Sequence, residues 1–149
     1  MSMEHYRAAQ KAGKKDLQTR TSQKLPVEMP ALDAILEHVD ISGEVPLGLV
    51  DIPTELIVGT KTCGRASSFA PNFMPILGEN TEFAAKWSSL CDAHLKEGIR
   101  DPIVAYEYMN HYYIQEGNKR VSVLKYFDAI SIPGYVTPVS YTHLRAHET

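Results

Sequence analysis

Hydrophobic and polar residues follow two spacings along the chain, and the spacing changes from one segment to the next. After Asn80, apolar side chains recur every three or four residues, which predicts a helix that ends at Gly98. A second helix is predicted over about 118–127. Runs rich in Val, Ile and Tyr predict strands, and these runs are 45–52, 103–108, 112–116 and 131–137. Strands interleaved with helices predict the α/β class, here a small mixed sheet flanked by helices.

Glycine, proline and asparagine mark the connections between these elements. Asn110-His111 predicts a hairpin turn between the two tyrosine-rich strands. Pro133-Gly134 predicts that the last strand either lies at a sheet edge or carries a bulge. Residues 55–58 are expected to be extended, 59–70 to form a polar loop, and 72–77 to form one broken helical turn.

The first 43 residues show a different pattern, and we expect them to form a helical arm and linker ahead of a domain at 44–138. Residues 4–20 favour helix but have a thin apolar stripe. A proline-bounded linker follows at 25–29, and then a short helix at 31–39. Basic residues outnumber acidic ones in this arm. A solvated helix is favoured over a nucleic-acid-binding arm, because exposed helices often carry such charge.

Composition narrows the class of protein. The chain has 149 residues, enough for one domain, and its net charge of −3 argues against nucleic-acid binding over the whole surface. Cys63 and Cys91 lie far apart without the spacing of a zinc site or a disulfide framework. No apolar run reaches membrane-spanning length, and the N-terminus lacks a signal-peptide pattern. We therefore expect a cytoplasmic protein without membrane contact.

The last residues, 139–149, match no fold element. They closely resemble the translation, in one reading frame, of a transposase adapter used in sequencing libraries. We therefore expect an artefactual tail, and a natural protein that continues beyond about Pro138 into a missing C-terminal region. His143 and His147 are not counted as candidate ligands for this reason.

The candidate chemistry is concentrated where the strand ending at Glu116 turns through Gly117-Asn118-Lys119-Arg120 into a helix. The first amides of a helix have no internal partners, and the helix dipole adds positive potential there. Cations are disfavoured at that end unless an anion lies among them. A phosphate could accept bonds from the amides and from Arg120 in bidentate fashion, while Gly117 allows close approach. The alternative is a plain turn with surface cations.

The order of several short motifs resembles the ParB/sulfiredoxin family. Gly117 and Arg120 match the turn that reads Gly-Glu-Arg-Arg in ParB proteins and Gly-Cys-His-Arg in sulfiredoxins. Gly64-Arg65 lies where ParB proteins carry a Pro-Arg box. The remaining matches are the opening strand at 45–53, the segment at 95–103 and Ile132-Pro133. This resemblance implies a ParB/sulfiredoxin-like fold of the ParB N-terminal type.

The family implies a nucleoside triphosphate as ligand, with Mg²⁺ as a candidate companion. Its phosphates would lie on Gly117, Asn118, Lys119 and Arg120, with Arg65 from the opposing loop. ParB-like proteins are bacterial, cytoplasmic, nucleotide-dependent switches. They also imply DNA binding through the missing C-terminal region, and a homodimer is an assembly the family allows.

Two other functions stay open at this point. One is an enzyme, a metal-dependent phosphotransferase, nucleoside triphosphate hydrolase or nuclease, in which Glu116 and Asp101 would be the catalytic carboxylates. The other is a ligand-free scaffold, in which Arg120 would brace a carboxylate. Sulfiredoxin chemistry is not expected, because Asn118 replaces the cysteine that it needs.

Overall fold

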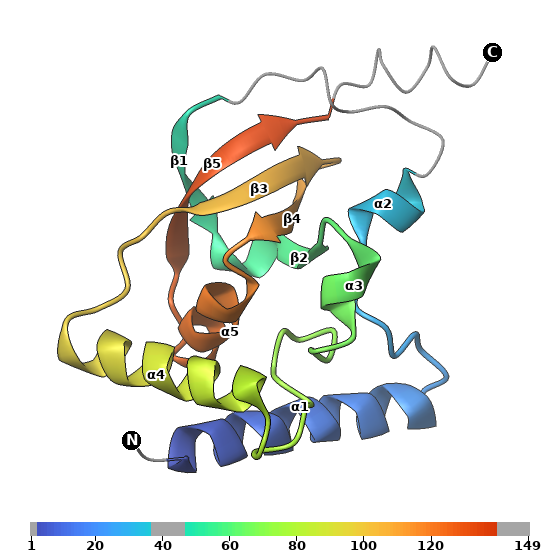
Figure 1. Cartoon of the computed structure of the whole chain (residues 1–149). Helices are drawn as coiled ribbons and strands as arrows, with labels where there is room; N and C mark the ends of the chain where they lie inside the picture. The colour runs from blue at the N-terminus through green and yellow to red at the C-terminus, as the bar shows by residue number, and fades with distance from the viewer. Residues whose placement is uncertain (1–2, 37–46, 140–149) are drawn as a thin grey trace.

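A five-stranded mixed sheet forms the centre of the computed structural model, which describes residues 3–36 and 47–139 (Figure 1). The strands are β1 (Leu49–Pro53), β2 (Ile57–Thr60), β3 (Ile103–Tyr108), β4 (His111–Glu116) and β5 (Ser131–Pro138). Their spatial order is β1-β5-β3-β4-β2. The β1–β5 and β3–β4 pairs are antiparallel, whereas the β3–β5 and β2–β4 pairs are parallel.

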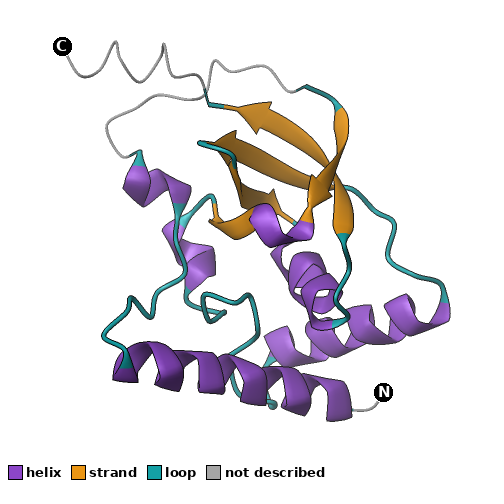
Figure 2. Ribbon diagram, turned by 180° about the vertical axis from the view of Figure 1, so that it is seen from behind, coloured by secondary structure: helices purple, strands orange, loops and turns teal. Residues whose placement is uncertain are grey.

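Helices flank this sheet, and this arrangement confirms the predicted α/β class. The chain begins with a helix, as predicted. The helices are α1 (Glu4–Ser22), α2 (Leu32–Ile35), α3 (Cys63–Ala66), α4 (Glu82–Lys96) and α5 (Asn118–Tyr126), with a 3-10 turn at Thr54–Leu56. Seen from behind, the short helices α2 and α3 lie to one side and the longer helices lie together below the sheet (Figure 2). None of the described helices has the length and apolarity required to cross a bilayer.

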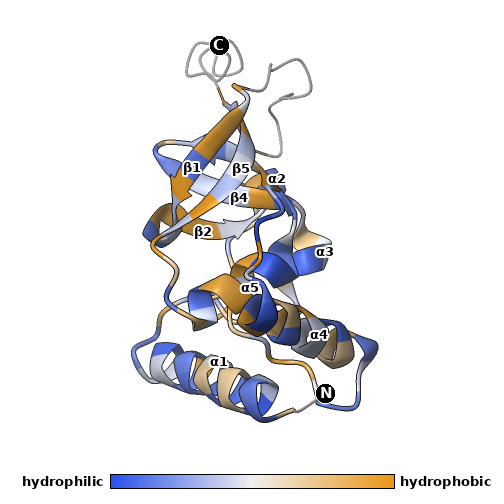
Figure 3. Cartoon of the chain, turned by 90° about the vertical axis from the view of Figure 1, so that its left-hand side faces the viewer, coloured by the Kyte–Doolittle hydropathy of each residue, from blue (hydrophilic) through white to orange (hydrophobic). Residues whose placement is uncertain are grey.

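Two of the three apolar clusters among the described residues lie against α5. Between the sheet and α5, the buried residues include Ile52, Ile103, Ile114, Val121 and Ile132. Between α5, α4 and α1 they include Tyr6, Ala9, Trp87, Cys91 and Val123. Helix α5 therefore lies between the sheet on one side and α1 with α4 on the other (Figure 3). Val121 packs in the first cluster and Val123 in the second.

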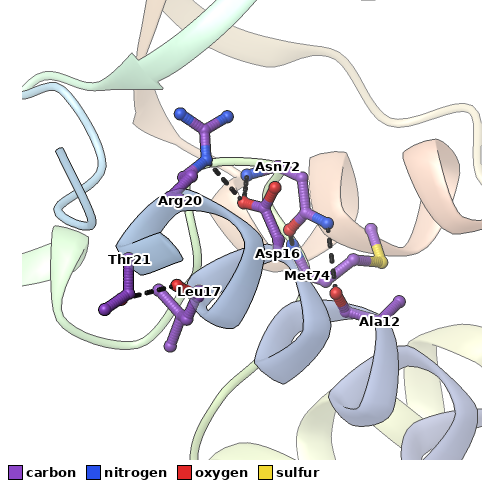
Figure 4. Close-up of polar contacts among 7 residues, drawn as sticks. All are labelled: Ala12, Asp16, Leu17, Arg20, Thr21, Asn72 and Met74. Carbon is purple, nitrogen blue, oxygen red and sulfur yellow. Dashed lines mark hydrogen bonds and ion pairs between the residues drawn. The ribbon is translucent and has the colours of Figure 1, made fainter. Parts of the chain in front are cut away.

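Helix α1 packs onto the body of the protein as well as carrying an exposed basic face. Its buried side includes Tyr6, whose hydroxyl donates to Leu77 O at 2.6 Å. Asp16 accepts a hydrogen bond from the Asn72 amide at 3.3 Å and pairs with Arg20 at 2.9 Å (Figure 4). A Cβ on Gly13 would lie 2.7 Å from Pro75 O, so the helix needs glycine there.

Several boundaries of helices and strands in the structure differ from the predicted ones. Residues 55–58 divide between the 3-10 turn and β2, and the predicted polar loop at 59–70 contains α3. The predicted helical turn at 72–77 is wrong: Phe73 has φ +70°, and Phe69 pairs with Pro75 as an isolated β-bridge. The hairpin turns at Met109 and Asn110, both with positive φ, one residue earlier than predicted.

The prediction that β5 is an edge or bulged strand is wrong. It lies between β1 and β3 and pairs with both without a register shift. Proline is tolerated because pairing with β3 begins only at Gly134, so Pro133 precedes the residues that need a donor toward β3. A Cβ on Gly134 would lie 2.7 Å from Ile52 Cδ1 and 2.8 Å from Ile103 Cγ1, which explains the glycine.

The packed chain extends to Val139. This residue is 5% exposed and its amide donates to Glu107 O at 2.8 Å. It therefore packs with the domain, although the sequence pattern placed it at the start of the tail. The rest of that predicted tail, 140–149, and the last three residues of the predicted helix at 31–39 lie outside the described residues, and the described part of that helix contains α2.

Candidate functional site

The turn between β4 and α5 has a conformation that only glycine adopts easily. Gly117 has φ +100°, in the left-handed region. A Cβ at this position would lie 2.7 Å from Ile103 Cγ2 and 3.3 Å from the Arg120 guanidinium carbon. The residue is thus fixed both by backbone strain and by the packing of its neighbours.

The N-terminus of α5 has no capping side chain and no acidic residue in its first turn. The first bond from the helix body to the turn runs from Val121 N to Gly117 O at 2.9 Å. The amides of Asn118, Lys119 and Arg120 precede it and have no partner within the helix. Their dipoles converge on the same point, which favours an anion there.

Asn118 adds an unmet hydrogen-bonding group to this helix end. The residue is 7% exposed, and within residues 3–36 and 47–139 its Oδ1 has no partner. A buried polar atom without a partner costs about 1–3 kcal/mol. The two ends of an amide have the same shape, so either can be turned toward a ligand.

These groups line a hollow of about 600 Å³, which is in the range of small-ligand pockets. The walls come from residues 115–120 of the turn, from one face of α4 and from Arg65 of α3. The α4 residues are Ala85, Lys86, Ser89 and Leu90. Four elements, β4, α5, α4 and α3, therefore contribute to one site.

The hollow is strongly basic, although the whole chain carries a net charge of −3. Four cationic side chains line it against one carboxylate: Arg65, Lys86, Lys119 and Arg120 against Glu116. Burial lowers the pKa of Lys119, and the nearby charges of Arg65 and Lys86 lower it further, partly opposed by Glu82. Lys119 Nζ also lies 5.4 Å from the centre of the Phe83 ring. The cations are close enough to repel one another.

Arg120 connects this hollow to the strand beside it. Its Nη1 donates to Asp101 O at 3.1 Å and to Pro102 O at 2.9 Å, just before β3 begins. No acceptor among the described residues binds its Nε or Nη2. The scaffold hypothesis expected Arg120 to brace a carboxylate, but it supports backbone carbonyls instead. One edge of the guanidinium is left for a ligand.

The two candidate carboxylates do not line the same hollow. Glu116 lines the basic hollow, whereas Asp101 lines a neighbouring one with Glu97 and Arg100. Arg120 contributes to both. The part of the chain that the structure describes holds no group of three or more His, Cys, Asp or Glu residues that could bind a metal ion. A catalytic pair of Glu116 and Asp101 is therefore not assembled in one hollow.

Sequence reasoning named the turn residues and Arg65, which the structure brings together, but missed the α4 wall. Lys86, Ser89 and Leu90 follow at helical spacing of three and four residues, so they share one face of α4. Gln115 was also missed. The helical spacing of these α4 residues can be recognised in the sequence. Nothing in the sequence indicates that this face of α4 lies against α5.

No family model matches this sequence. A comparison with curated proteins also finds no match. Among solved structures, sulfiredoxin from Arabidopsis thaliana is similar at 20% identity and a TM-score of 0.43, covering 68% of this chain and 97% of that chain. A likeness at this level carries no argument about the site.

Proposed function

We propose that the basic hollow binds the phosphate groups of a nucleotide, with a nucleoside triphosphate as ligand. The observation that carries this proposal is the gathering of Arg65, Lys86, Lys119 and Arg120 around an uncapped helix N-terminus. Such an arrangement costs free energy when it is empty, because like charges repel and the helix dipole adds to them. A polyanion removes both costs.

Each wall of the hollow would have a separate role toward such a ligand. The amides of 118–120 would donate to phosphate oxygens, and the free edge of Arg120 would bind one phosphate in bidentate fashion. Arg65 and Lys86 would close over the phosphates from the two opposite elements. Leu90 and Ala85 offer an apolar surface for the less polar part of the nucleotide.

The wider role in this proposal is a nucleotide-dependent switch in a larger, DNA-associated protein of ParB-like type. It is supported by the order of sequence motifs around Gly64-Arg65 and Gly117–Arg120. A switch requires that the ligand prefer one conformation of the protein over another. Arg120 could couple the two, since it contacts both the hollow and the carbonyls before β3.

Calorimetric titration with each of the four common ribonucleoside triphosphates, in buffers with and without magnesium, tests the proposal. We expect saturable binding of at least one, and a rise in melting temperature by mass action. Arg65→Ala should weaken that binding, whereas Arg100→Ala, another exposed arginine but one that lines only the neighbouring hollow, should not. No heat from any nucleotide in folded protein would end this proposal. Analysis of the nucleotide after the titration shows whether it is also hydrolysed.

A further inference from the structure

We infer that the exposed face of α1 binds the phosphate backbone of duplex DNA without reading the base sequence. Helix α1 lies on the side of the domain opposite the sheet (Figure 1). None of its residues, all of which the structure describes, lines the basic hollow at the start of α5. This surface is therefore separate from the proposed nucleotide site.

Charge is divided unevenly along the chain. The first 24 residues contain six basic and two acidic residues, whereas the rest of the chain contains nine basic and sixteen acidic residues. A chain with a net charge of −3 thus carries a positive helix beside an acidic remainder. Such a division directs an approaching polyanion toward the positive element.

Three lysines of α1 are exposed and have no ion-pair partner among the described residues, and these are Lys11, Lys14 and Lys15. They are three and four residues apart along the helix, so they lie on one face. Arg7 lies one turn earlier on the same face, but it is offset by Glu79 at 2.7 Å and by the charge of Glu4. We therefore count the three lysines, and not Arg7, as phosphate contacts.

The other acidic residues close to α1 leave these lysines unpaired. Asp16 pairs with Arg20 at 2.9 Å (Figure 4), and its side chain is 19% exposed. Glu55 and Asp128 line a hollow on the flank of the helix, beside Ala12. An exposed helix of the ordinary kind balances its cations with acidic residues one turn away. The exposed face of α1 does not.

The chemistry of this face fits a duplex. From Lys11 to Gln18 the helix rises about 10 Å, and each strand of a duplex carries a phosphate about every 3.4 Å of its axis. Gln18 is exposed and extends the face with a neutral side chain of a kind that also contacts phosphates. Residues 7–22 contain no aromatic side chain on which unpaired bases could stack. A duplex is therefore favoured over a single strand.

The opposite side of α1 is anchored in the protein, and this separates DNA from an anionic membrane as the partner. Tyr6 and Ala9 are buried in one cluster with Trp87, and Gln10 Nε2 donates to Leu77 O at 2.9 Å. A helix that binds a membrane surface inserts its apolar face among the lipids. The apolar face of α1 is already buried, so its charges are what it presents. The same anchoring holds the lysines in place before DNA arrives.

The first test follows the fluorescence anisotropy of a labelled DNA duplex as the 149-residue chain is added at low salt. We expect saturable binding, and a plot of log affinity against log salt concentration with a slope of about −3, because each phosphate contact contributes about −0.9. The affinity should not depend on the base sequence of the duplex. Absence of duplex binding at low salt in folded protein would overturn the inference, and so would tighter binding of a single strand of the same length.

Lys14→Gln and Lys96→Gln are a matched pair, because both lysines are exposed and lie on helices but Lys96 is in the last turn of α4. Lys14→Gln should weaken duplex binding roughly threefold to tenfold and make the salt slope shallower by about 0.9. Lys96→Gln should change the affinity by less than about twofold, since salt screens distant charges. Equal losses in the two variants would show a general effect of net charge and would overturn the assignment to α1.

Replacing all three lysines with glutamine should abolish duplex binding, while the melting temperature stays within about two degrees, because exposed substitutions have small effects on stability. Duplex binding that survives this change in folded protein would overturn the inference. Vesicles that contain phosphatidylserine test the other partner, and lysine-dependent binding to vesicles without binding to the duplex would also overturn it. Nucleotide titrations of the same variant report on the hollow by itself, because these lysines do not line it.

Discussion

Helices α4 and α5 begin in opposite ways, although they pack against each other and form adjacent walls of one hollow. Helix α4 is capped by Thr81, whose hydroxyl accepts a bond from Ala84 N at 3.1 Å, and has Glu82 in its first turn. Helix α5 has Gly117 as its N-cap, no side-chain cap and two cations at its start. The free amides and the dipole at the start of α4 are met by its own cap and acidic residue, whereas those at the start of α5 are not.

This difference separates a structural helix end from one that is suited to a ligand. A Thr cap and an acidic first turn each stabilise a helix, by about 1 kcal/mol for the cap and about 0.3–1 kcal/mol for the charge. The start of α5 lacks both and places Lys119 and Arg120 where they oppose the dipole. The same positions that weaken the unliganded helix would strengthen the binding of an anion.

The largest expected effect comes from the glycine that shapes the α5 start. Gly117→Ala should lower the free energy of unfolding by about 2–4 kcal/mol, because it combines positive φ with a clash at Ile103. Gly98→Ala separates the two causes: Gly98 has φ +82° but open space around it, so about 1–2 kcal/mol is expected. Gly64→Ala has neither feature and should be close to neutral. Urea unfolding of the three variants measures this order, and equal losses at 117 and 98 would contradict it.

Arg120 gives the next largest effect and tests the cationic start of α5. Arg120→Ala should weaken triphosphate binding roughly tenfold to a hundredfold, and Arg120→Lys nearly as much, because an ammonium cannot reproduce the planar fork. Arg120→Ala should also lower the stability of the unliganded protein by about 1–2 kcal/mol, since its bonds to Asp101 O and Pro102 O are lost. Calorimetry and thermal unfolding read the two effects separately. Loss of stability without loss of affinity would make Arg120 a purely structural residue.

The Arg120 bonds show where sequence reasoning stops. The period of apolar residues predicted α4 and α5, and the run of β-branched and aromatic residues predicted β3 and β4, because these signals are local. The glycine turn was also readable, since Gly117 separates a strand pattern from a helix pattern. The carbonyls that Arg120 binds lie 18 and 19 positions earlier in the chain, and only the fold brings them near.

The same limit explains the errors in β5 and at the α4 wall. Pro133 and Gly134 are local signals against an interior strand, and they are overridden by the position at which β3 pairing begins. Lys86 has an ordinary helical neighbourhood with Glu82 four positions earlier, so its sequence indicates only a surface ion pair. Its place in the hollow depends on how α4 packs against α5.

Opposite charge changes at the two helix starts should have effects of opposite sign. Lys119→Gln should raise the stability of the unliganded protein by about 0.3–1 kcal/mol, because a cation leaves the positive end of α5. Glu82→Gln should lower it by a similar amount, because α4 loses a favourable charge and the Lys86 pair. Thermal unfolding at low salt measures both. If the two variants moved stability in the same direction, the contrast between the helix starts would be refuted.

The smallest effect is a dependence of phosphate affinity on alkaline pH. The pKa of Lys119 is lowered from its ordinary value of 10.5 by burial and by the charges of Arg65 and Lys86. As the pH rises, Lys119 therefore loses its charge earlier than an ordinary lysine does. As pH rises through that lowered pKa, the folded state binds fewer protons than the unfolded state. Lys119 therefore adds stability to the free protein with rising pH while phosphate affinity falls. Lys119→Arg should flatten the fall in affinity, since arginine stays charged. Titrations of tripolyphosphate at several alkaline pH values measure how steeply the affinity falls with pH. If the affinity of Lys119→Arg fell just as steeply, the pH dependence would belong to another group.

The central claim is that an anion binds at the start of α5 and not at the start of α4, and amide NMR tests it most directly. Tripolyphosphate is titrated into the 149-residue chain, and the shifts of backbone amides are followed in both first turns. The account predicts the largest saturable shifts at 117–120, with much smaller changes at 82–84. Shifts that are largest at 82–84 or on the exposed lysines of α1, or no saturable shifts at 117–120, would contradict it.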